Sequence, residues 1–417
     1  METLALLGGT PIRSTPFPKG QRFGAEELEQ LREALEQGTL FYWSGNKVKA
    51  FTRKFAEMYG KKHCVATSSG TAALHVALGA VGVTEGDEVI VSPITDMGSL
   101  VGILFQNAIP VFADLDPHTY NMTAASIEAC ITDKTRAIMV VHLAGNPSDM
   151  DAIMEVARRH NVKVVEDCAQ SYLSYAKGRL SGTQGDIGCF SLNEFKHIST
   201  GDGGMLITDD DTLFERAARF ADKNYNRHAT TVAEMRAVPY LAPNYRMTEL
   251  QGAVAIAQLD RLPGICAIHT HHGDRITNGI QNLPGIHPHK VRAGDVCSYW
   301  FYMLRLNEKL AGVDAVTFAD ALIAEGIPSQ QGYIPSCVYG YDMFQNLSAY
   351  QGTHAPFDSK YYGRPVSYPP GLCPNAEEIL RTAVKININQ FYTDSDINDI
   401  IAAVNKVAGW YAANPQA

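Results

Sequence analysis

Short apolar runs alternate with helical patterns between residues 70 and 167, and this alternation limits the possible folds more than any other feature of the sequence. Four apolar runs are expected to form buried strands, separated by amphipathic or apolar helices. Strands that alternate with helices predict a mostly parallel sheet covered by helices on both faces. The expected strands are Glu88–Val91, Pro110–Ala113, Ala137–His142 and Val162–Glu166, and the expected helices are Thr71–Ala80, Met97–Gln106, Ala124–Cys130 and Met150–His160.

Two further helices are expected before this region. In the first, Leu28, Leu31 and Leu35 recur at helical spacing, which predicts an amphipathic helix. In the second, apolar residues recur in the same way from Val48 to Met58, and a glycine at position 60 is expected to end the helix. An amphipathic helix turns such a stripe towards the core.

The composition changes after about residue 262. Proline and glycine become frequent, and Pro263–Gly264 is expected to interrupt the chain. Ser298–Leu306 is a candidate strand rich in aromatic residues, and helical patterns follow near Thr317–Glu325 and Asp394–Val407. We therefore expect a large domain of residues 1–262, with an N-terminal arm of residues 1–24, and a smaller α+β domain of residues 263–417.

The overall composition excludes several classes of protein. Lys and Arg number 35 against 44 Asp and Glu among 417 residues, so the net charge is −9 and the chain lacks the positive field of a general nucleic-acid binder. No apolar run approaches the roughly 18 residues of a membrane span, and Leu4–Leu7 is too short for a signal peptide. The eight cysteines form no Cys-x-x-Cys pair, which argues against a disulfide framework or zinc site and favours a cytoplasmic protein.

The segment Ala66–Leu74 (ATSSGTAAL) is the first candidate binding site, because small and hydroxylated residues lead directly into an apolar helix. Free backbone N–H groups and the helix dipole favour an anion at a helix N-terminus. Gly70 would let the backbone approach that anion closely, and Thr71 would add a hydroxyl donor. Taken alone, an ordinary Ser or Thr helix cap is the commoner explanation.

The second candidate is Val164–Gln170 (VVEDCAQ), where two acidic residues end an expected buried strand. A doubly wound fold binds its ligands beyond such strand ends. Asp167 could pair there with a cationic heterocycle. An aspartate that caps the following helix explains the residue equally well.

The third candidate is Lys196, which follows the apolar segment that begins at Ile187 and precedes the glycine-rich segment Thr200–Gly204. A lysine among apolar residues is usually a surface residue whose ammonium reaches water. Held in an apolar pocket, a lysine has a lowered pKa and becomes a nucleophile that forms Schiff bases. The glycines permit tight backbone turns beside a ligand.

The histidines are interpreted as structural. His142 ends an expected strand, and bonding to backbone groups is its more common role. His269, His271 and His272 are close in sequence, but on a helix His271 would point away from His269. Two ligands do not complete a zinc site and no third is evident nearby, so we expect no metal and interpret these residues as a solvated helix face.

An anion site, an acid at a strand end and a lysine before a glycine-rich strand entry follow one another as in fold-type I pyridoxal-phosphate (PLP) enzymes. The sequence resembles the DegT/DnrJ/EryC1/StrS family of sugar and cyclitol aminotransferases over nearly its whole length. The segments that carry this resemblance are LALLGGTPIR, SSGTAAL, GDEVIVSP, HLAGNPSDMDAI, VVEDCAQ, GDIGCFSLNEFKHISTGDGGMLIT and NYRMTELQGAVAIAQL. The resemblance implies a large domain with a mostly parallel seven-stranded sheet and a smaller α+β C-terminal domain.

The resemblance also implies roles for individual residues. Lys196 would join PLP as a Schiff base, and Asp167 would hold the pyridinium nitrogen. Gln170 would lie near the ring and its 3′-oxygen. Asn244, in PNYRM, would reach the phosphate of the neighbouring subunit's cofactor, so the active unit would be a homodimer. The residues implied to bind the phosphate are Gly70, Thr71 and Ser191.

The chain departs from the family pattern in two places. The family commonly places an aromatic residue on the cofactor ring, in the segment that matches Ser92–Gly98, and Asp96 stands at that position here. An acid cannot stack on a ring, so another residue covers the ring or the substrate geometry differs. The late HYxPlH-like segment also differs, because it reads Gly332–Tyr339 (GYIPSCVY).

The resemblance implies an aminotransferase that moves an amino group from glutamate or glutamine to a keto-sugar nucleotide or a keto-cyclitol. The segments LALLGGTPIR and GYIPSCVYGYDMF slightly favour the keto-cyclitol as acceptor. Some relatives carry histidine in place of the lysine and act as dehydratases, so Lys196 favours transamination. The alternatives are a same-fold dehydratase or aromatising synthase, a broad amine transaminase and a non-catalytic PLP-binding sensor. A Rossmann-like dehydrogenase is the alternative outside PLP chemistry.

Overall fold

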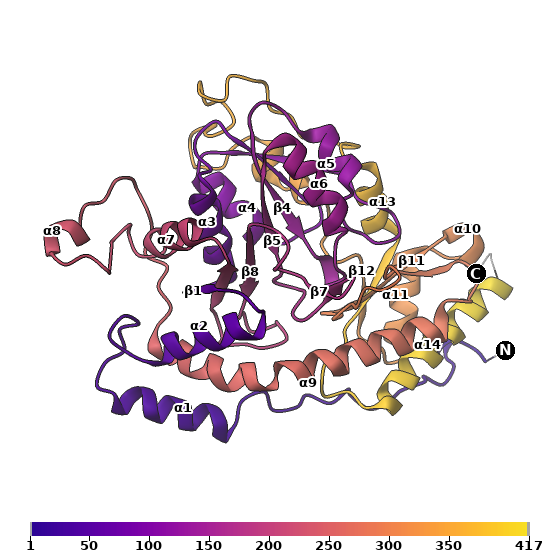
Figure 1. The fold of residues 1–417 in the computed structure, drawn as a ribbon. Coiled ribbons are helices and arrows are strands. Elements are labelled where there is room, and N and C mark those ends of the chain that lie inside the picture. Colours follow the sequence, from indigo (N-terminus) through magenta and orange to yellow (C-terminus); the bar gives the residue numbers. More distant parts are fainter. Residues whose placement is uncertain (1, 415–417) are drawn as a thin grey trace.

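A seven-stranded sheet forms the centre of the structure, a computed structural model that describes residues 2–414 (Figure 1). Its strands are β1 (His63–Thr67), β2 (Glu88–Val91), β3 (Ile109–Phe112), β4 (Thr135–Val141), β5 (Lys163–Asp167), β8 (Ile187–Ser191) and β9 (Gly204–Thr208). They lie in the order β1–β9–β8–β5–β4–β2–β3. β9 is antiparallel to both neighbours and the other adjacent pairs are parallel, which confirms the expected mostly parallel sheet.

Helices cover both faces of this sheet. β2, β8 and β9 are buried along their whole lengths, as expected for strands covered on both sides. The strands and helices expected between residues 70 and 167 are confirmed, with ends that differ by two residues or fewer. The helices that accompany the sheet in the chain are α2 (Lys47–Met58), α3 (Gly70–Val81), α4 (Gly98–Phe105), α5 (Ala124–Cys130), α6 (Met150–His160) and α7 (Asp211–Phe220).

The strand order reverses between β2 and β4, since the chain first adds β3 on one side of β2 and then β4 and β5 on the other. The carboxyl ends of parallel strands meet at one edge of a sheet, and a crevice opens there at such a reversal. The loops after β2, β5 and β8 therefore lie together at this edge.

A second sheet of four antiparallel strands lies in the C-terminal part of the chain, in the order β10–β11–β13–β12. Its strands are β10 (Ile286–Pro288), β11 (Tyr302–Leu306), β12 (Ser329–Gln331) and β13 (Ala383–Ile386), and helices α11 (Ala315–Ala324) and α14 (Asp394–Ala413) share its apolar core. The expected strand Ser298–Leu306 is confirmed only from Tyr302, because Tyr299 has φ +40° and interrupts the extended backbone.

The remaining elements are short, apart from two helices described below. They are η1 (Ala5–Leu7), η2 (Leu143–Gly145), β6 (Tyr175–Ala176), β7 (Arg179–Leu180), α8 (Val232–Met235), α10 (Glu308–Ala311), η3 (Val338–Gly340), α12 (Asp342–Gln345) and α13 (Pro374–Thr382). In Figure 1, α8 lies on a loop that projects from the body of the molecule beyond α7.

The 32-residue helix α9 (Glu249–Ile280) runs along the base of the molecule in Figure 1 and packs against α2 and α14. Pro263 lies inside it, so the expected interruption at this point is wrong. A proline inside a helix costs about 3 kcal/mol, and buried neighbours such as Leu259, Leu262 and Cys266 hold the helix in place through their apolar contacts. The division into domains at residues 262 and 263 stays a prediction.

Helix α1 (Ala25–Glu36) is present where expected, but its leucine stripe faces outward. Leu28 is 69% exposed and Leu35 is 62% exposed, whereas Glu27 and Ala34 are buried. The buried Glu27 carboxylate has a hydrogen-bond partner, because it accepts from Nε2 of Gln258 in α9 at 2.8 Å. A buried carboxylate needs such a donor. This contact therefore holds α1 with Glu27 facing the protein and Leu28 and Leu35 facing outward.

The N-terminal arm packs on the helices of the smaller sheet. The buried Glu325 carboxylate, at the end of α11, accepts hydrogen bonds from the backbone N–H groups of Ala5 at 2.8 Å and Ile12 at 3.0 Å. Lys406 of α14 also contacts this carboxylate, at 2.9 Å. The arm is thus fixed by specific polar contacts.

Glu249 links α9 to the N-terminus of α2 and provides a test of the fold. Its carboxylate is fully buried and accepts hydrogen bonds from the backbone N–H groups of Lys47 at 2.7 Å and Val48 at 3.1 Å, and from the side chain of Gln37 at 2.7 Å. We expect Glu249→Ala to lower the free energy of unfolding by about 3 kcal/mol, because three donors lose their acceptor. Urea denaturation measures this change. Glu249→Gln, which keeps one acceptor oxygen, should lose less, and an unchanged Glu249→Ala midpoint would contradict the capping role.

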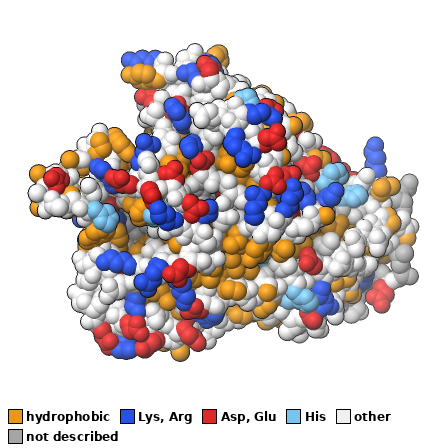
Figure 2. All heavy atoms as spheres, in the orientation of Figure 1, with side chains coloured by type: hydrophobic (Ala, Val, Ile, Leu, Met, Phe, Trp, Pro, Cys, Tyr) orange, Lys and Arg blue, Asp and Glu red, His pale blue; other side chains and the backbone are white. Residues whose placement is uncertain are grey.

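The face of the molecule seen in Figure 1 carries acidic and basic side chains interspersed, without a continuous basic surface (Figure 2). This distribution agrees with the net charge of −9. Among residues 2–414, no helix has both the length and the apolar character required to cross a lipid bilayer. All eight cysteines are free.

Candidate active site

Segments that follow β1, β2, β5 and β8 meet at the carboxyl edge of the large sheet and enclose a cavity of about 360 Å³. Six of the seven site residues expected from the sequence line this cavity, although they come from three separate segments. They are Gly70, Thr71, Asp167, Gln170, Ser191 and Lys196.

Lys196 brings an amine into this cavity. Burial lowers the pKa of Lys196 to about 8, and the negative charges of Asp167 and Asp96 oppose part of this effect. Its Nζ lies 3.5 Å from the centre of the Trp300 ring. With this pKa about a tenth of the amine is neutral at pH 7, and the neutral amine is the form that attacks a carbonyl carbon.

Asp167 is the last residue of β5 and is 5% exposed. Burial raises its pKa, while two donors favour the charged form: the Ser99 hydroxyl at 2.7 Å from Oδ2 and the Ala169 N–H at 3.0 Å from Oδ1. The Thr95 and Ser99 hydroxyl oxygens are 2.7 Å apart, so Thr95 is placed to donate to Ser99. This chain of two hydroxyl groups fixes the direction of the carboxylate.

The N-terminus of α3, where the sequence predicts an anion site, lines this cavity. Ser69 caps the helix by accepting a hydrogen bond from the N–H of Ala72 at 3.0 Å, so the cap and the anion site occur together. The first N–H groups of a helix have no partner within it. A Cβ atom on Gly70 would lie 2.5 Å from the Cβ of Ser191. Only glycine therefore permits this close approach of α3 to β8, and the resulting cradle suits a phosphate-sized anion.

Gln170 and aromatic residues complete the cavity wall. Oε1 of Gln170 accepts a hydrogen bond from the N–H of Ala144 at 2.8 Å, and its Nε2 lies 3.4 Å from the hydroxyl oxygen of Tyr333. Trp300 donates from Nε1 to the carbonyl oxygen of Phe195 at 2.7 Å. Trp300 belongs to the expected strand Ser298–Leu306, and Tyr333 belongs to the segment that departs from the family pattern.

Arg22, near the end of the N-terminal arm, binds the backbone of the segment that contains Lys196. Its guanidinium donates hydrogen bonds to the carbonyl oxygens of Glu194 and Lys196, and to that of His197 at 3.3 Å. The side chain of His197 itself is buried and bonds to the carbonyl oxygen of Ser298 at 3.0 Å. Sequence patterns gave no signal for Arg22, because its partners are backbone atoms more than 170 positions away.

Asn244, the seventh expected residue, is exposed and does not line the cavity of its own chain. Its backbone forms an isolated bridge with Asp222, and the next two residues contact the segment before α3: Tyr245 accepts from the Ser68 N–H at 2.7 Å, and Arg246 pairs with Thr67. Asn244 is thus held beside the anion site, at the surface of the molecule.

His142 has the contacts expected of a structural histidine. Its Nε2 lies 3.0 Å from the Glu166 carboxylate, and its Nδ1 accepts from the N–H of Ser148 at 3.0 Å. The expectation of a solvated face for the other three histidines is wrong in part, because His269 and His272 are each 3% exposed. Both rings contact distant loop segments, His269 the carbonyl oxygen of Tyr299 and His272 that of Tyr392, whereas His271 is exposed.

The expectation that no third metal-binding type of residue lies near these histidines is also wrong. The distant residue Asp394, at the start of α14, lies close to His271 and His272. Its Oδ1 is 2.6 Å from the Arg275 guanidinium and 3.0 Å from Nε2 of His271. We interpret this group as an ion-paired contact between α9 and α14, since the carboxylate is already paired with a cation.

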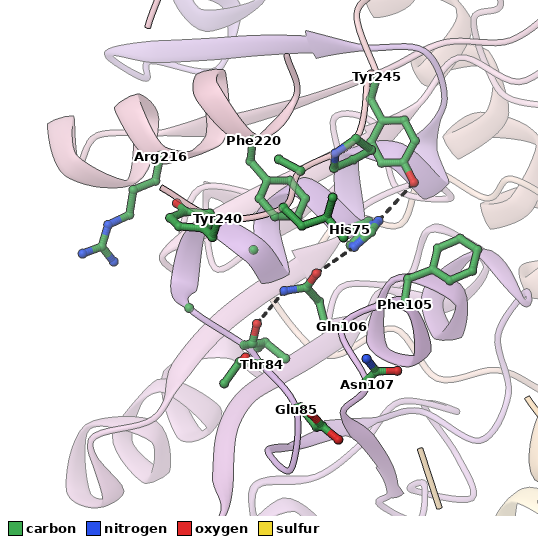
Figure 3. A pocket seen from close by; sticks show the side chains of 16 residues that line it. His75, Thr84, Glu85, Phe105, Gln106, Asn107, Arg216, Phe220, Tyr240 and Tyr245 are labelled. Carbon is green, nitrogen blue, oxygen red and sulfur yellow. Dashed lines mark hydrogen bonds between the residues drawn. The ribbon is translucent and has the colours of Figure 1, made fainter. Parts of the chain in front are cut away.

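A larger cavity, of about 930 Å³, lies beside α3 and lacks the chemistry of the first (Figure 3). Its buried His75 contacts the Tyr245 hydroxyl at 3.1 Å and Oε1 of Gln106 at 3.0 Å. Burial lowers the pKa of His75, which keeps the ring neutral. The rim carries exposed apolar side chains, among them Leu241 and Phe105. Both ring nitrogens of His75 are engaged, so the candidate active site is the smaller cavity.

Comparisons with known proteins agree with this architecture. The chain is 34% identical over 335 residues to L-glutamine:scyllo-inosose aminotransferase of Streptomyces griseus, covering 78% of this chain and 79% of that protein. It is 38% identical over 304 residues to GDP-perosamine synthase of Caulobacter vibrioides, covering 70% and 77%. The solved structure of an aminotransferase from Psychrobacter cryohalolentis superposes with a TM-score of 0.81 at 29% identity, covering 94% of this chain and 98% of that one.

These likenesses define the chain as an aminotransferase. A family model matches residues 21–405, and the chain belongs to the DegT/DnrJ/EryC1/StrS aminotransferase family. The family and the enzyme class predicted from the sequence are therefore confirmed, and the Rossmann-like dehydrogenase is excluded.

Proposed function

We propose that this aminotransferase uses pyridoxal phosphate to move an amino group from glutamate or glutamine to a keto-sugar nucleotide or a keto-cyclitol. The observation that carries the proposal is the meeting of Lys196, Asp167 and the N-terminus of α3 at one cavity. These groups suit the aldehyde, the ring nitrogen and the phosphate of the cofactor, respectively. The names of the two relatives above support the donor and the acceptor classes.

The residues of the cavity would have separate roles in the reaction. Bound pyridoxal phosphate would supply an electron sink for the donor's Cα. The buried Asp167 carboxylate would keep the ring nitrogen protonated, because a charge in low dielectric is stabilised strongly by an opposite charge. Gln170 would lie near the ring and its 3′-oxygen, and Gly70, Thr71 and Ser191 would bind the phosphate.

Lys196 would have two tasks. In the resting enzyme its Nζ would hold the aldehyde carbon. Once the donor amine has replaced it, the free amine would move the proton at the donor's Cα, as a general base and acid. A pKa of about 8 suits this role, because the amine can accept and return a proton near neutral pH. In the overall exchange the donor would give up its amino group and leave as a keto acid, and the ketone would gain that group and leave as an amine.

A donor-and-acceptor screen tests the proposal against its alternatives. The purified protein is loaded with pyridoxal phosphate and mixed with L-glutamine or L-glutamate and a ketone acceptor. One keto acid released for each amine formed is the expected result. Loss of water without keto-acid release would indicate a dehydratase or an aromatising synthase. Turnover of simple amines would indicate a broad amine transaminase, and an unchanged visible spectrum with every donor would indicate a sensor.

We also propose a homodimer in which Asn244 reaches the phosphate of the partner's cofactor. Its exposure beside the anion site, together with its absence from the cavity of its own chain, supports this arrangement. The scattered free cysteines support a cytoplasmic location.

Mixing two inactive variants tests the sharing of Asn244. Asn244→Ala and Lys196→Ala homodimers are each expected to be defective at both sites. A mixed dimer would hold one site with both lesions and one intact site, so a 1:1 mixture is expected to regain about a quarter of the wild-type activity. Activity is measured after subunit exchange has been verified with differently tagged subunits. No recovery in spite of exchange would contradict the shared site.

A further inference from the structure

Asp96 is an acidic residue of the candidate active site that has no role in the function proposed above. It follows β2, its side chain is exposed, and it lines the cavity together with Lys196. Its Oδ1 accepts a hydrogen bond from the N–H of Gly98, the first residue of α4, at 2.8 Å. This bond fixes the direction of the carboxylate, and the positive end of the helix dipole favours its charge.

The Asp96 carboxylate acts on groups across the cavity. Burial lowers the pKa of Lys196, and the charges of Asp167 and Asp96 oppose this effect. Burial also raises the pKa values of Tyr333 and Tyr341, and the charge of Asp96 adds to both increases. These groups belong to segments far from Asp96 in the sequence, so the carboxylate faces the space that a substrate would enter.

The charges on the cavity wall do not balance. Three carboxylates line the cavity, those of Asp96, Asp167 and Asp202. Among the lining residues, which all belong to the described part of the chain, Lys196 is the only lysine or arginine. Under the proposed function the cofactor's ring nitrogen pairs with Asp167, and the amine of Lys196 is free again when the acceptor enters. This one cation faces the two carboxylates of Asp96 and Asp202, so the wall that the acceptor meets carries a net negative charge.

We propose that Asp96 is a specificity-determining residue, which selects an acceptor ketone with hydroxyl or amino groups and excludes acceptors that carry a phosphate. This inference rests on the proposed function and narrows its acceptor class. A carboxylate accepts hydrogen bonds from hydroxyl groups and pairs with an ammonium group, whereas it repels a diphosphate. The volume of about 360 Å³, part of which the cofactor takes, lies at the small end for ligand sites and suits a single ring.

A comparison of two acceptors tests the inference. The probes are scyllo-inosose, which carries hydroxyl groups and no phosphate, and a UDP-linked 4-keto-6-deoxyhexose. We expect the wild-type kcat/KM to be about a hundredfold higher for scyllo-inosose, and Asp96→Asn to reduce this ratio about tenfold, mainly through KM. Asparagine keeps the oxygen that accepts from Gly98 and removes only the charge. Asp260→Asn, an equal charge change on the exposed side of α9, is the matched control and should leave the ratio unchanged.

Binding of UDP alone, measured by calorimetry on the cofactor-loaded proteins, gives a readout without turnover. Asp96→Asn is expected to bind UDP about tenfold more tightly than the wild type. UDP binding also tests whether the charge of Asp96 repels phosphate when neither ketone is a substrate. A wild-type preference for the nucleotide-linked ketone, or equal UDP affinity in both proteins, would overturn the inference.

The half-reaction separates this inference from the proposed function. L-Glutamine alone, without an acceptor, should release one keto acid for each loaded site. Absence of that release from every donor would overturn the proposed function. Normal release together with an unchanged acceptor ratio in Asp96→Asn would overturn only the role of Asp96.

Discussion

Lys196→Ala is expected to remove the visible absorbance of the lysine-bound cofactor and to lower kcat by about four orders of magnitude, because no other amine in the cavity can replace it. The fold should survive, because the substitution keeps the backbone hydrogen bonds of residue 196 to Arg22 and Asn193. Absorbance, donor-dependent keto-acid release and thermal unfolding measure the three effects. Borohydride reduction followed by peptide mapping should place the cofactor on Lys196, and an active Lys196→Ala enzyme would refute the assignment.

Lys385 provides the matched control for this experiment. Burial lowers its pKa as well, and its Nζ lies 5.3 Å from the centre of an aromatic ring, that of Phe301. It stands in β13, outside the cavity. Lys385→Ala is expected to keep the visible absorbance, which would show that a buried lysine over an aromatic ring does not by itself bind the cofactor.

The pKa of Lys196 also predicts how cofactor uptake depends on pH. Burial disfavours the charged ammonium, so Lys196 loses its proton near pH 8 instead of near 10.5. Only the neutral amine attacks an aldehyde. The rate of uptake by the cofactor-free protein should rise about tenfold per pH unit below 8 and level off above it. A stopped-flow absorbance series measures this profile, and a rise that continues to pH 10 would contradict the lowered pKa.

Asp167→Ala is expected to lower kcat about a hundredfold or more while some cofactor binding remains, because the ring nitrogen loses its counter-charge and the other contacts persist. The rate of keto-acid release in a single turnover with L-glutamine measures this effect. Cofactor affinity, measured by equilibrium dialysis, shows how much binding is left. A full-rate variant would contradict the proposed role of Asp167.

Ser99→Ala is expected to weaken the role of Asp167 without removing it. The Ser99 hydroxyl donates to Oδ2 of Asp167, and its loss removes one of the groups that favour the charged carboxylate. We expect a smaller loss of rate than in Asp167→Ala, about tenfold. Thr95→Val, which removes the hydroxyl behind Ser99, should fall between Ser99→Ala and the wild type.

The large sheet and most of the site could be predicted from the sequence because their signals are local. Each strand and helix between residues 70 and 167 has its own apolar pattern, and its ends were found to within two residues. Gly70, Asp167 and Lys196 lie in short motifs whose residues are adjacent in the chain. A motif of this kind survives in a single sequence, and the doubly wound topology then brings the separate motifs to one edge.

The residues that were missed depend on contacts between distant segments. Ser99 and Tyr333 look like ordinary helix and loop residues until the fold brings them to Asp167 and Gln170. The outward leucine stripe of α1 and the burial of His269 and His272 are decided by the partners of those helices, which helical spacing does not reveal. Pro263 is tolerated for the same reason, since packing outweighs the local preference.

The contact between Arg22 and the lysine segment joins two parts of the chain that are synthesised at different times. The guanidinium leaves the ribosome early, and its carbonyl acceptors at Glu194 and Lys196 follow more than 170 residues later. Arg22 therefore lacks these partners until about half of the chain has been synthesised. The contact of Arg22 with the backbone of Lys196 can form only once both segments have been synthesised.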